Sequence, residues 1–216
     1  MKLRLVDENG AEVDQPYEIR LPGWTEERYF AEAPEEGTHE LVDGELIVHS
    51  PVNIHHQEIV GFLTFLLEGV VSKKSCGQVF NGPGVLRLRE NLCREPDIFF
   101  VSRQRPSRVT EEYVDGPADF VIEVLSESSR TRDLKEKASD YEAAGVREYW
   151  AVDPARRAVT VHRLQGRAFE VRTVQDGRVE STDVPGYWVK VEWLLERPLP
   201  GKLECLRQLL GQPKLG

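Results

Sequence analysis

Residues 119–153 constrain the fold more than any other part of this 216-residue chain. The stretch reads DFVIEVLSESSRTRDLKEKASDYEAAGVREYWAVD, which predicts a strand, a polar turn, a helix and a second strand. Successive side chains of a strand alternate between its faces, so Val121 and Ile122 point in opposite directions. Apolar residues on both faces are typical of a strand in a sheet that is covered on both sides. The sequence therefore predicts a central sheet between two packed layers.

Two carboxylates stand out in this setting. Glu123 lies inside the first strand, where it must be protonated, paired or bound to a cation, because burying an unpaired charge is very unfavourable. Upstream, Pro96 opens the apolar run EPDIFFVS, which places Asp97 at the end of a strand. A strand-end Asp, a mid-strand Glu and a nearby Lys are the components of a magnesium-dependent phosphodiesterase site. The alternative is a purely structural network between Glu123 and a nearby Arg or Lys.

The helix that follows Glu123 offers two lysines. Its apolar stripe is formed by Leu134, Ala138 and Tyr141. At about 100° per residue, Lys137 lies roughly 50° from the centre of this stripe and Lys135 roughly 110° away. Lys137 is therefore expected to face the sheet.

These residues resemble a large family of putative restriction endonucleases of unknown function, the Uma-type domain, which is assigned to the PD-(D/E)XK nuclease superfamily. The resemblance rests on the Pro-Asp pair, on IEVLS, on Asp133, Lys137 and Tyr141 at four-residue spacing, and on GVREYWAVDP. It covers residues 25–195 and includes HELVDGELIVHSP and the HHQ segment. Strands of that superfamily carry Glu and Lys two residues apart. Here Leu125 occupies the lysine position, and the resemblance implies that Lys137 replaces it from the helix.

The resemblance implies a divalent-metal-dependent nuclease that hydrolyses phosphodiester bonds in DNA. Asp97 and Glu123 would hold Mg²⁺ or Mn²⁺, with the backbone carbonyl of Val124 as a further oxygen ligand. Lys137 would position the attacking water or stabilise the charge that develops at phosphorus. The alternative is a catalytically inactive module that keeps the nuclease fold and binds nucleic acid or a protein partner. Leu125 in place of the strand lysine favours this alternative.

Four further residues are candidates for accessory roles. Asp133 would pair with Lys137, and Tyr141 would orient it; an exposed i,i+4 ion pair between Asp133 and Lys137 is the simpler interpretation. Glu45 follows a predicted turn and is either a solvent-facing strand residue or a contact to metal or substrate. His56 begins a helix and is either a capping or core-edge residue or a neighbour of the substrate.

Net charge limits the mode of nucleic-acid binding. The chain carries a formal charge of −9, which argues against broad nonspecific binding to nucleic acid but not against a local basic groove. Six arginines lie on either side of Asp97 and either contact phosphates or form a salt-bridged, solvated face: Arg87, Arg89, Arg94, Arg103, Arg105 and Arg108.

The predicted fold class is α+β: a restriction-endonuclease-like core with a mixed sheet flanked by helices, followed by a β-rich C-terminal extension. Strands near Asp97, Glu123 and Tyr149 should be neighbours, with helices 54–71 and 132–144 packed on them. Three parts are expected, namely an N-terminal hairpin appendage over 1–24, the core domain over 25–195 and a tail helix within 196–216.

Local signals add detail to this plan. Thr25 is a predicted helix N-cap, and Asp43 with Gly44 predicts a hairpin. Residues 102–117 are expected to form a polar connection, and YWVKVEWLL to be extended.

Compartment and assembly follow from simpler features. No apolar run approaches the roughly 18 residues of a membrane span, and the start lacks a signal-peptide core, so we expect a cytoplasmic protein that does not bind membranes. Cys76, Cys93 and Cys205 are odd in number and widely spaced, which indicates free thiols. A homodimer is expected because cutting two strands suits two-fold symmetry, with Trp188, Trp193 and the tail helix supplying apolar surface.

Overall fold

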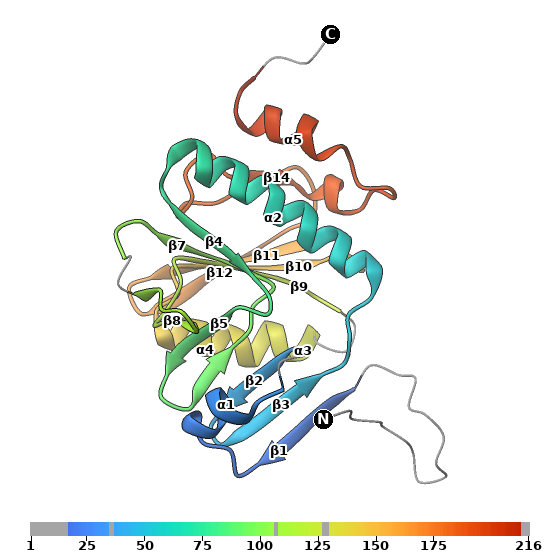
Figure 1. Ribbon diagram of the computed structural model, residues 1–216. Coiled ribbons are helices and arrows are strands. Elements are labelled where there is room, and N and C mark those ends of the chain that lie inside the picture. The colour runs from blue at the N-terminus through green and yellow to red at the C-terminus, as the bar shows by residue number, and fades with distance from the viewer. Residues whose placement is uncertain (1–16, 35–36, 106–107, 127–129, 213–216) are drawn as a thin grey trace, which may run out of the picture.

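The computed structural model describes residues 17–34, 37–105, 108–126 and 130–212, which form two six-stranded sheets and a small two-stranded one (Figure 1). The first sheet has the order β1-β3-β2-β6-β5-β8 and contains β1 (Glu18–Pro22), β2 (His39–Val42), β3 (Glu45–His49), β5 (Val85–Arg89), β6 (Leu92–Arg94) and β8 (Tyr113–Asp115). The second, central sheet has the order β12-β11-β10-β9-β7-β4 and contains β4 (Gly77–Asn81), β7 (Ile98–Ser102), β9 (Phe120–Val124), β10 (Glu148–Asp153), β11 (Ala158–Gln165) and β12 (Ala168–Val174).

The central sheet confirms the predicted mixed architecture. Strand β9 pairs in parallel with β10 and antiparallel with β7, so the strands near Glu123, Tyr149 and Asp97 are neighbours as expected. Helices cover the sheet on both sides (Figure 1). This arrangement accounts for apolar residues on both faces of β9.

The two faces of β9 contribute to different clusters. Ile122 packs in a cluster with residues of α2 (Ile54–Lys74), whereas Val121 packs with Tyr141 of α4 (Ala138–Ala144) and with residues of the first sheet. The first sheet lies on the same side of the central sheet as α4, away from α2 (Figure 1). The centre of the molecule is therefore layered as α2, central sheet, and then α4 with the first sheet.

The helix after β9 contains a wide turn. It begins as α3 (Arg130–Arg132), continues through the π-helical turn η2 (Asp133–Lys137) and ends as α4. The predicted helix over 132–144 is therefore confirmed. Lys137 is buried and Lys135 is exposed, as the helical geometry predicts. Turns of this kind are frequent at functional sites.

The N-terminal signals are confirmed where the structure describes them. Helix α1 (Glu26–Glu32) begins after Thr25, whose hydroxyl accepts a hydrogen bond from Arg28 N–H at 3.2 Å. Asp43 and Gly44 join β2 to β3 with φ values of 48° and 94°, as a tight hairpin turn requires. The first half of the predicted terminal hairpin lies outside the described residues, while β1 pairs with β3.

The predicted β-rich C-terminal extension is confirmed, and it includes the two-stranded sheet of β13 (Arg178–Glu180) and β14 (Trp188–Lys190). Two other segments differ from expectation. The connection over 102–117 contains the short strand β8, whose pairing with β5 was not evident in the sequence. YWVKVEWLL is extended only at first, because it turns into the 3₁₀ helix η3 (Val191–Leu194).

Trp188 and Trp193 do not form an exposed surface, so that part of the dimer prediction is wrong. They are 8% and 6% exposed, and their rings lie 5.2 Å apart. The 3₁₀ turn folds Trp193 onto α2, where its ring lies 6.3 Å from that of Phe62.

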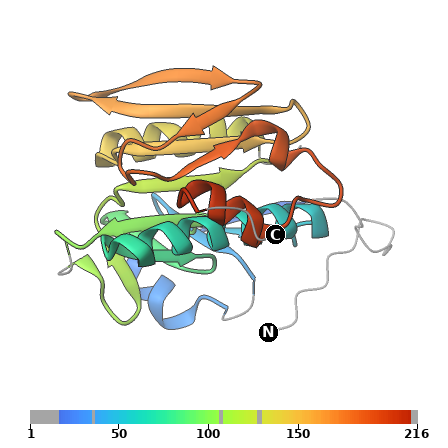
Figure 2. The ribbon, with the colours of Figure 1, turned by 90° about the horizontal axis from the view of Figure 1, so that it is seen from above.

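The tail helix α5 (Lys202–Leu209) packs on α2, as Figures 1 and 2 show. A side-chain carbon at Gly69 would lie 2.5 Å from Leu206, so glycine permits this close approach. Lys202 Nζ donates to the carbonyl of Gly61 at 2.9 Å. Most of the apolar face of the tail helix thus packs against α2 of the same chain.

Two simpler expectations concern cysteines and membranes. Cys76, Cys93 and Cys205 are free thiols, as predicted. Among the helices in the described part of the chain, none is long and apolar enough to cross a membrane.

Candidate active site

The antiparallel pairing of β7 with β9 brings Asp97 beside Glu123. Ile98 is opposite Ile122, so the residues next to them in the chain also meet. Val124 N–H donates to Asp97 Oδ2 at 2.7 Å, and Asp97 N–H donates to Glu123 Oε2 at 3.4 Å. The structure therefore brings these two carboxylates to one place.

Lys137 reaches the same place from the helix. Its Nζ donates to Glu123 Oε1 at 2.8 Å, and Tyr141 donates its hydroxyl to the same oxygen at 2.7 Å. Tyr141 thus contacts the lysine's carboxylate partner rather than the lysine. Asp133 Oδ1 lies 3.7 Å from Lys137 Nζ, and both residues are buried, which excludes the exposed i,i+4 pair.

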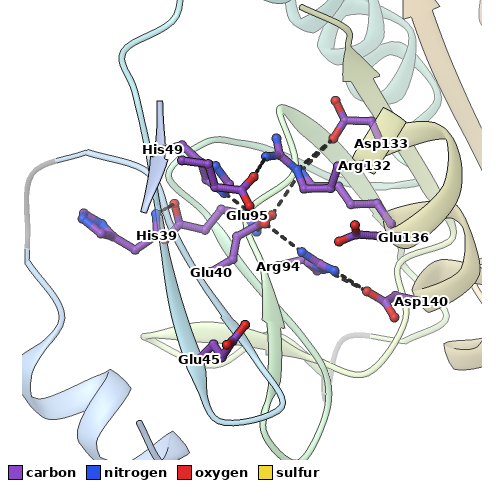
Figure 3. Close-up of polar contacts among 12 residues, drawn as sticks. His39, Glu40, Glu45, His49, Arg94, Glu95, Arg132, Asp133, Glu136 and Asp140 are labelled. Atoms are coloured by element: carbon purple, nitrogen blue, oxygen red, sulfur yellow. Dashed lines mark hydrogen bonds and ion pairs between the residues drawn. The ribbon is translucent and has the colours of Figure 1, made fainter. Parts of the chain in front are cut away.

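Glu40 is a member of this cluster that sequence reasoning missed. It is fully buried in β2 of the first sheet, and its Oε1 lies 3.0 Å from Lys137 Nζ. Its Oε2 accepts a hydrogen bond from Arg94 at 2.9 Å and lies 3.1 Å from His49 Nε2. Arg94 continues the chain of charges to Asp140, 3.0 Å from its Nε (Figure 3). The ammonium of Lys137 is therefore held between carboxylates from two different sheets.

The electrostatics of the cluster follow from burial and mutual charge. Burial raises the pKa of Glu123 to about 7, and the negative charge of Asp97 adds to this effect while Lys137 opposes it. Burial alone would lower the pKa of Lys137, but Glu123 and Glu40 together raise it. Burial also opposes ionisation of Glu40, yet Lys137 and Arg94 hold its pKa well below the usual range. A further cation near Asp97 would stabilise the ionised form of Glu123.

His56 is a buried residue in the first turn of α2, which fits the core-edge interpretation, whereas the cap of this helix is Asn53. Its position beside a substrate stays a prediction. Its backbone N–H is capped by the side chain of Asn53 at 2.9 Å, at the start of α2. Its Nε2 lies 3.2 Å from Asp97 Oδ2, and this contact raises the pKa of the imidazole although burial opposes the change. The helix start therefore places a histidine against the carboxylate pair.

A cleft of about 380 Å³ opens onto these groups. The charged side chains that line it are Glu18, Glu95, Asp97, Glu123, Arg132, Asp133 and Lys137. His56 and Val124 also line it. The cleft is thus acidic, with two cations on its helical wall.

Glu45 lies apart from this cleft. Its side chain is 41% exposed and lies 3.5 Å from Arg20, and in Figure 3 it stands away from the network around Glu40. The structure thus places Glu45 as a solvent-facing strand residue.

Four of the six arginines on either side of Asp97 form ion pairs, namely Arg87, Arg89, Arg94 and Arg105. Arg87 pairs with Glu26 at 2.9 Å, and Arg89 pairs with Asp43 at 2.7 Å. Arg94 is buried in the cluster described above. These arginines fit the salt-bridged interpretation.

The carboxylate pair can be tested for fit to a metal. Within the described ranges, no group of three or more His, Cys, Asp and Glu residues is arranged to hold a metal ion. Mg²⁺, however, typically uses one or two protein carboxylates together with waters and substrate phosphates. Asp97 and Glu123 therefore fit a site that the substrate completes. The raised pKa of Glu123 comes first from burial, and the negative charge of Asp97 adds to it.

The mixed sheets with helices packed on them define an α+β fold, and this fold is similar to that of a solved structure. A crystal structure described as a putative nuclease belonging to DUF820 from Anabaena variabilis ATCC 29413 is similar, with a TM-score of 0.67 and 19% sequence identity over 80% of this chain and 97% of that one. The Uma2 family, described as "Putative restriction endonuclease", matches residues 26–192, and the chain belongs to this family. None of the curated proteins compared with the chain matches it.

Proposed function

We propose that this protein is a divalent-metal-dependent nuclease that hydrolyses phosphodiester bonds in DNA. The observation that carries the proposal is the Lys137 ammonium, held between Glu123 and Glu40 beside Asp97 in an open cleft. The ammonium is thus a fixed positive charge next to the carboxylate pair of Asp97 and Glu123. This pair would attract a second positive charge, a divalent metal ion. Phosphoryl groups are stabilised in this way during hydrolysis.

Asp97 and Glu123 would hold Mg²⁺ or Mn²⁺, with the Val124 carbonyl as a further ligand implied by the family. A divalent ion bound there would supply an acidified water and would neutralise charge on the phosphate. Asp97 is suited to this role because its side chain is 23% exposed, whereas Glu123 is buried. One carboxylate thus faces the solvent and the other faces the lysine.

Lys137 would stabilise the negative charge that develops on the phosphate. Its Nζ is fixed by Glu123 and Glu40, so it needs little reorganisation when charge develops. Tyr141 shares the Glu123 oxygen and limits the rotation of that carboxylate. Glu40 acts on the lysine as a positioning residue.

The inactive-module alternative is weakened by this geometry. Leu125 is only 7% exposed and packs in the core, so a lysine on the strand would disturb the packing there. Lys137 reaches Glu123 from the helix and provides the missing ammonium. The chain therefore lacks the lysine at strand position 125, but the positive charge that this lysine would supply comes from Lys137 on the helix.

The test replaces Lys137 by Met, which keeps side-chain length and removes the charge. We expect cleavage of plasmid DNA with Mg²⁺ or Mn²⁺ to fall by a factor of about 10² to 10³, because one fixed charge beside the reacting group is removed. Lys135→Met is the control, since Lys135 is exposed on the same helix. Circular dichroism of both variants shows whether the fold is kept.

Metal binding is measured in the same series by calorimetry. Asp97→Asn should lose Mn²⁺ binding that the wild type and Lys135→Met retain. Equal cleavage by the folded Lys137 and Lys135 variants would remove Lys137 from the mechanism. Unchanged Mn²⁺ binding in Asp97→Asn would reject the carboxylate site.

We also propose that the protein acts in the cytoplasm as a homodimer, with residues 25–195 as the catalytic domain. A two-fold pair of clefts suits the two strands of a duplex. Light scattering at micromolar concentration should give twice the monomer mass of 24.6 kDa. A monomeric mass would reject the dimer.

A further inference from the structure

A second cleft adjoins the acidic one. It has a volume of about 270 Å³ and shares four lining residues with the first: Asn53, His56, Val124 and Ser126. The two clefts are therefore lobes of one continuous depression, divided by the end of β9 and the start of α2. What fills one lobe can extend into the other.

The charge of the second lobe is opposite to that of the first. Two arginines, Arg157 and Arg197, line it, and among the described residues that line it there is no carboxylate. The first lobe is rich in carboxylates. In a chain of net charge −9, this contrast marks the second lobe as a local site for anions.

Both arginines are exposed, and their guanidinium groups have no ion-pair or hydrogen-bond partner within the part of the chain that the structure describes. Other arginines are paired, such as Arg87 with Glu26. The pKa of Glu192 is lowered first by a hydrogen bond from Gly177 N–H, and the charge of Arg157 contributes less to this shift than the charge of Lys190 does. An unpaired guanidinium retains all of its donors for a ligand, and its planar fork suits phosphate.

The backbone at Arg157 is unusual. Its φ is 55°, in the left-handed region, which is uncommon for residues other than Gly, Asn and Asp. The turn is fixed by Arg157 N–H, which donates to the Pro154 carbonyl at 3.3 Å, and by Arg156 N–H, which donates to Asp153 at 3.1 Å. The preceding residue, Arg156, is exposed and lines neither lobe. The left-handed residue closes the hairpin between β10 and β11, and the hairpin places Arg157 on the wall of this lobe.

The rest of the wall combines polar residues at the start of α2 with an apolar part that includes Leu125, Leu194 and Leu195. Cations beside an apolar wall match a nucleotide, because the phosphate contacts the cations and the sugar and base cover the apolar surface. We propose that this lobe is the subsite for the nucleotide next to the bond that is cut, and that Arg157 and Arg197 contact its phosphate. The proposal rests on the proposed nuclease function, because it takes the acidic lobe as the place of the reacting phosphate.

The test compares two double variants that change net charge equally. Arg157→Asn with Arg197→Gln removes both cations from the lobe, and Asn tolerates the left-handed backbone at position 157. Arg156→Gln with Arg167→Gln is the control, since both residues are exposed and line neither lobe. Binding of a fluorescein-labelled DNA duplex is measured by anisotropy over a range of salt concentrations, with Ca²⁺ in place of Mg²⁺.

For each phosphate that the protein no longer neutralises, the slope of log Kd against log salt concentration falls by about 0.9 for duplex DNA. We expect a fall of about 2 in the lobe variant and no change in the control. Equal slopes in the two variants, with a wild type that binds and cleaves DNA, would overturn the subsite alone. The expected slopes without cleavage in Mg²⁺ or Mn²⁺ would support phosphate binding in this lobe but would reject the nuclease activity, and with it the position of that phosphate next to a cleaved bond. A wild type that binds no DNA would overturn both.

Discussion

The two faces of the central sheet carry different kinds of side chain at Ile122 and Glu123 of β9, apolar on one face and charged on the other. On one face, β9 packs Ile122 with Leu66 of α2 in a cluster of apolar side chains. On the other face, the next residue along the same strand is Glu123, which lies among buried charges. Side chains one position apart therefore belong to an apolar core in one case and to a cluster of buried charges beside an open cleft in the other.

The two faces should respond differently to amino-acid substitution. Apolar burial adds up residue by residue, so a truncation weakens the packing mainly at its own position. Buried charges depend on one another, because removing one partner leaves the others without compensation. A single substitution on the charged face should therefore affect several residues at once.

Replacing Arg94 by Met is the largest expected change in stability. Arg94 is 1% exposed and links Glu40 to Asp140, so the variant leaves Asp140 without this cation and weakens the compensation of Glu40. We expect a loss of about 3–5 kcal/mol in the free energy of unfolding. Urea denaturation monitored by circular dichroism measures it.

Leu66→Ala is the matched control on the apolar face, where Leu66 is fully buried. This variant should lose about 2–5 kcal/mol in the free energy of unfolding. The loss should not vary with pH, since no titrating group changes its surroundings. Loss of Mn²⁺ binding in Arg94→Met but not in Leu66→Ala would support the claim that only substitutions on the charged face affect several residues at once. Equal effects of both variants on Mn²⁺ binding would contradict it.

The smallest expected effect comes from Glu95, which borders the charged face. Burial raises its pKa from 4.5 to about 7, so the folded protein holds a proton there that the unfolded chain releases. The stability that this proton provides is present below the unfolded pKa and is lost as pH rises through the folded pKa. Glu95→Gln should match the wild type near pH 5 and exceed it by about 1–3 kcal/mol near pH 8. A difference that stays constant between these pH values, measured by urea denaturation, would contradict the shift.

The sequence predicted the elements that depend on local periodicity. The period-two alternation around Glu123 predicted a sheet covered on both sides, and the helical angle separated Lys137 from Lys135. The π-helical turn was not predicted, because it depends on how the helix packs rather than on its own residues. Lys137 faces the sheet in either geometry.

Glu40 was missed because its partners are distant in sequence, with Arg94 54 residues away. A signal was nevertheless present, since alternation in HELV places Glu40 on the same face as Val42, as a lone charge on a short apolar strand. The same argument identified Glu123. The burial of Trp193 could be expected from its apolar character, but its packing against α2 depends on a 3₁₀ turn that the sequence does not reveal.

Glu40 and Glu123 belong to different sheets, and Lys137 lies between them. The contacts of Lys137 with both carboxylates therefore form only when the first sheet is packed against the central sheet. Separation of the first sheet would leave Glu123 on an intact central sheet but would release the lysine from one of its two carboxylates. Subglobal opening of this kind precedes complete unfolding in many proteins. If the proposed nuclease function holds, activity would then disappear while most of the secondary structure persisted, because the lysine would no longer be fixed beside Glu123.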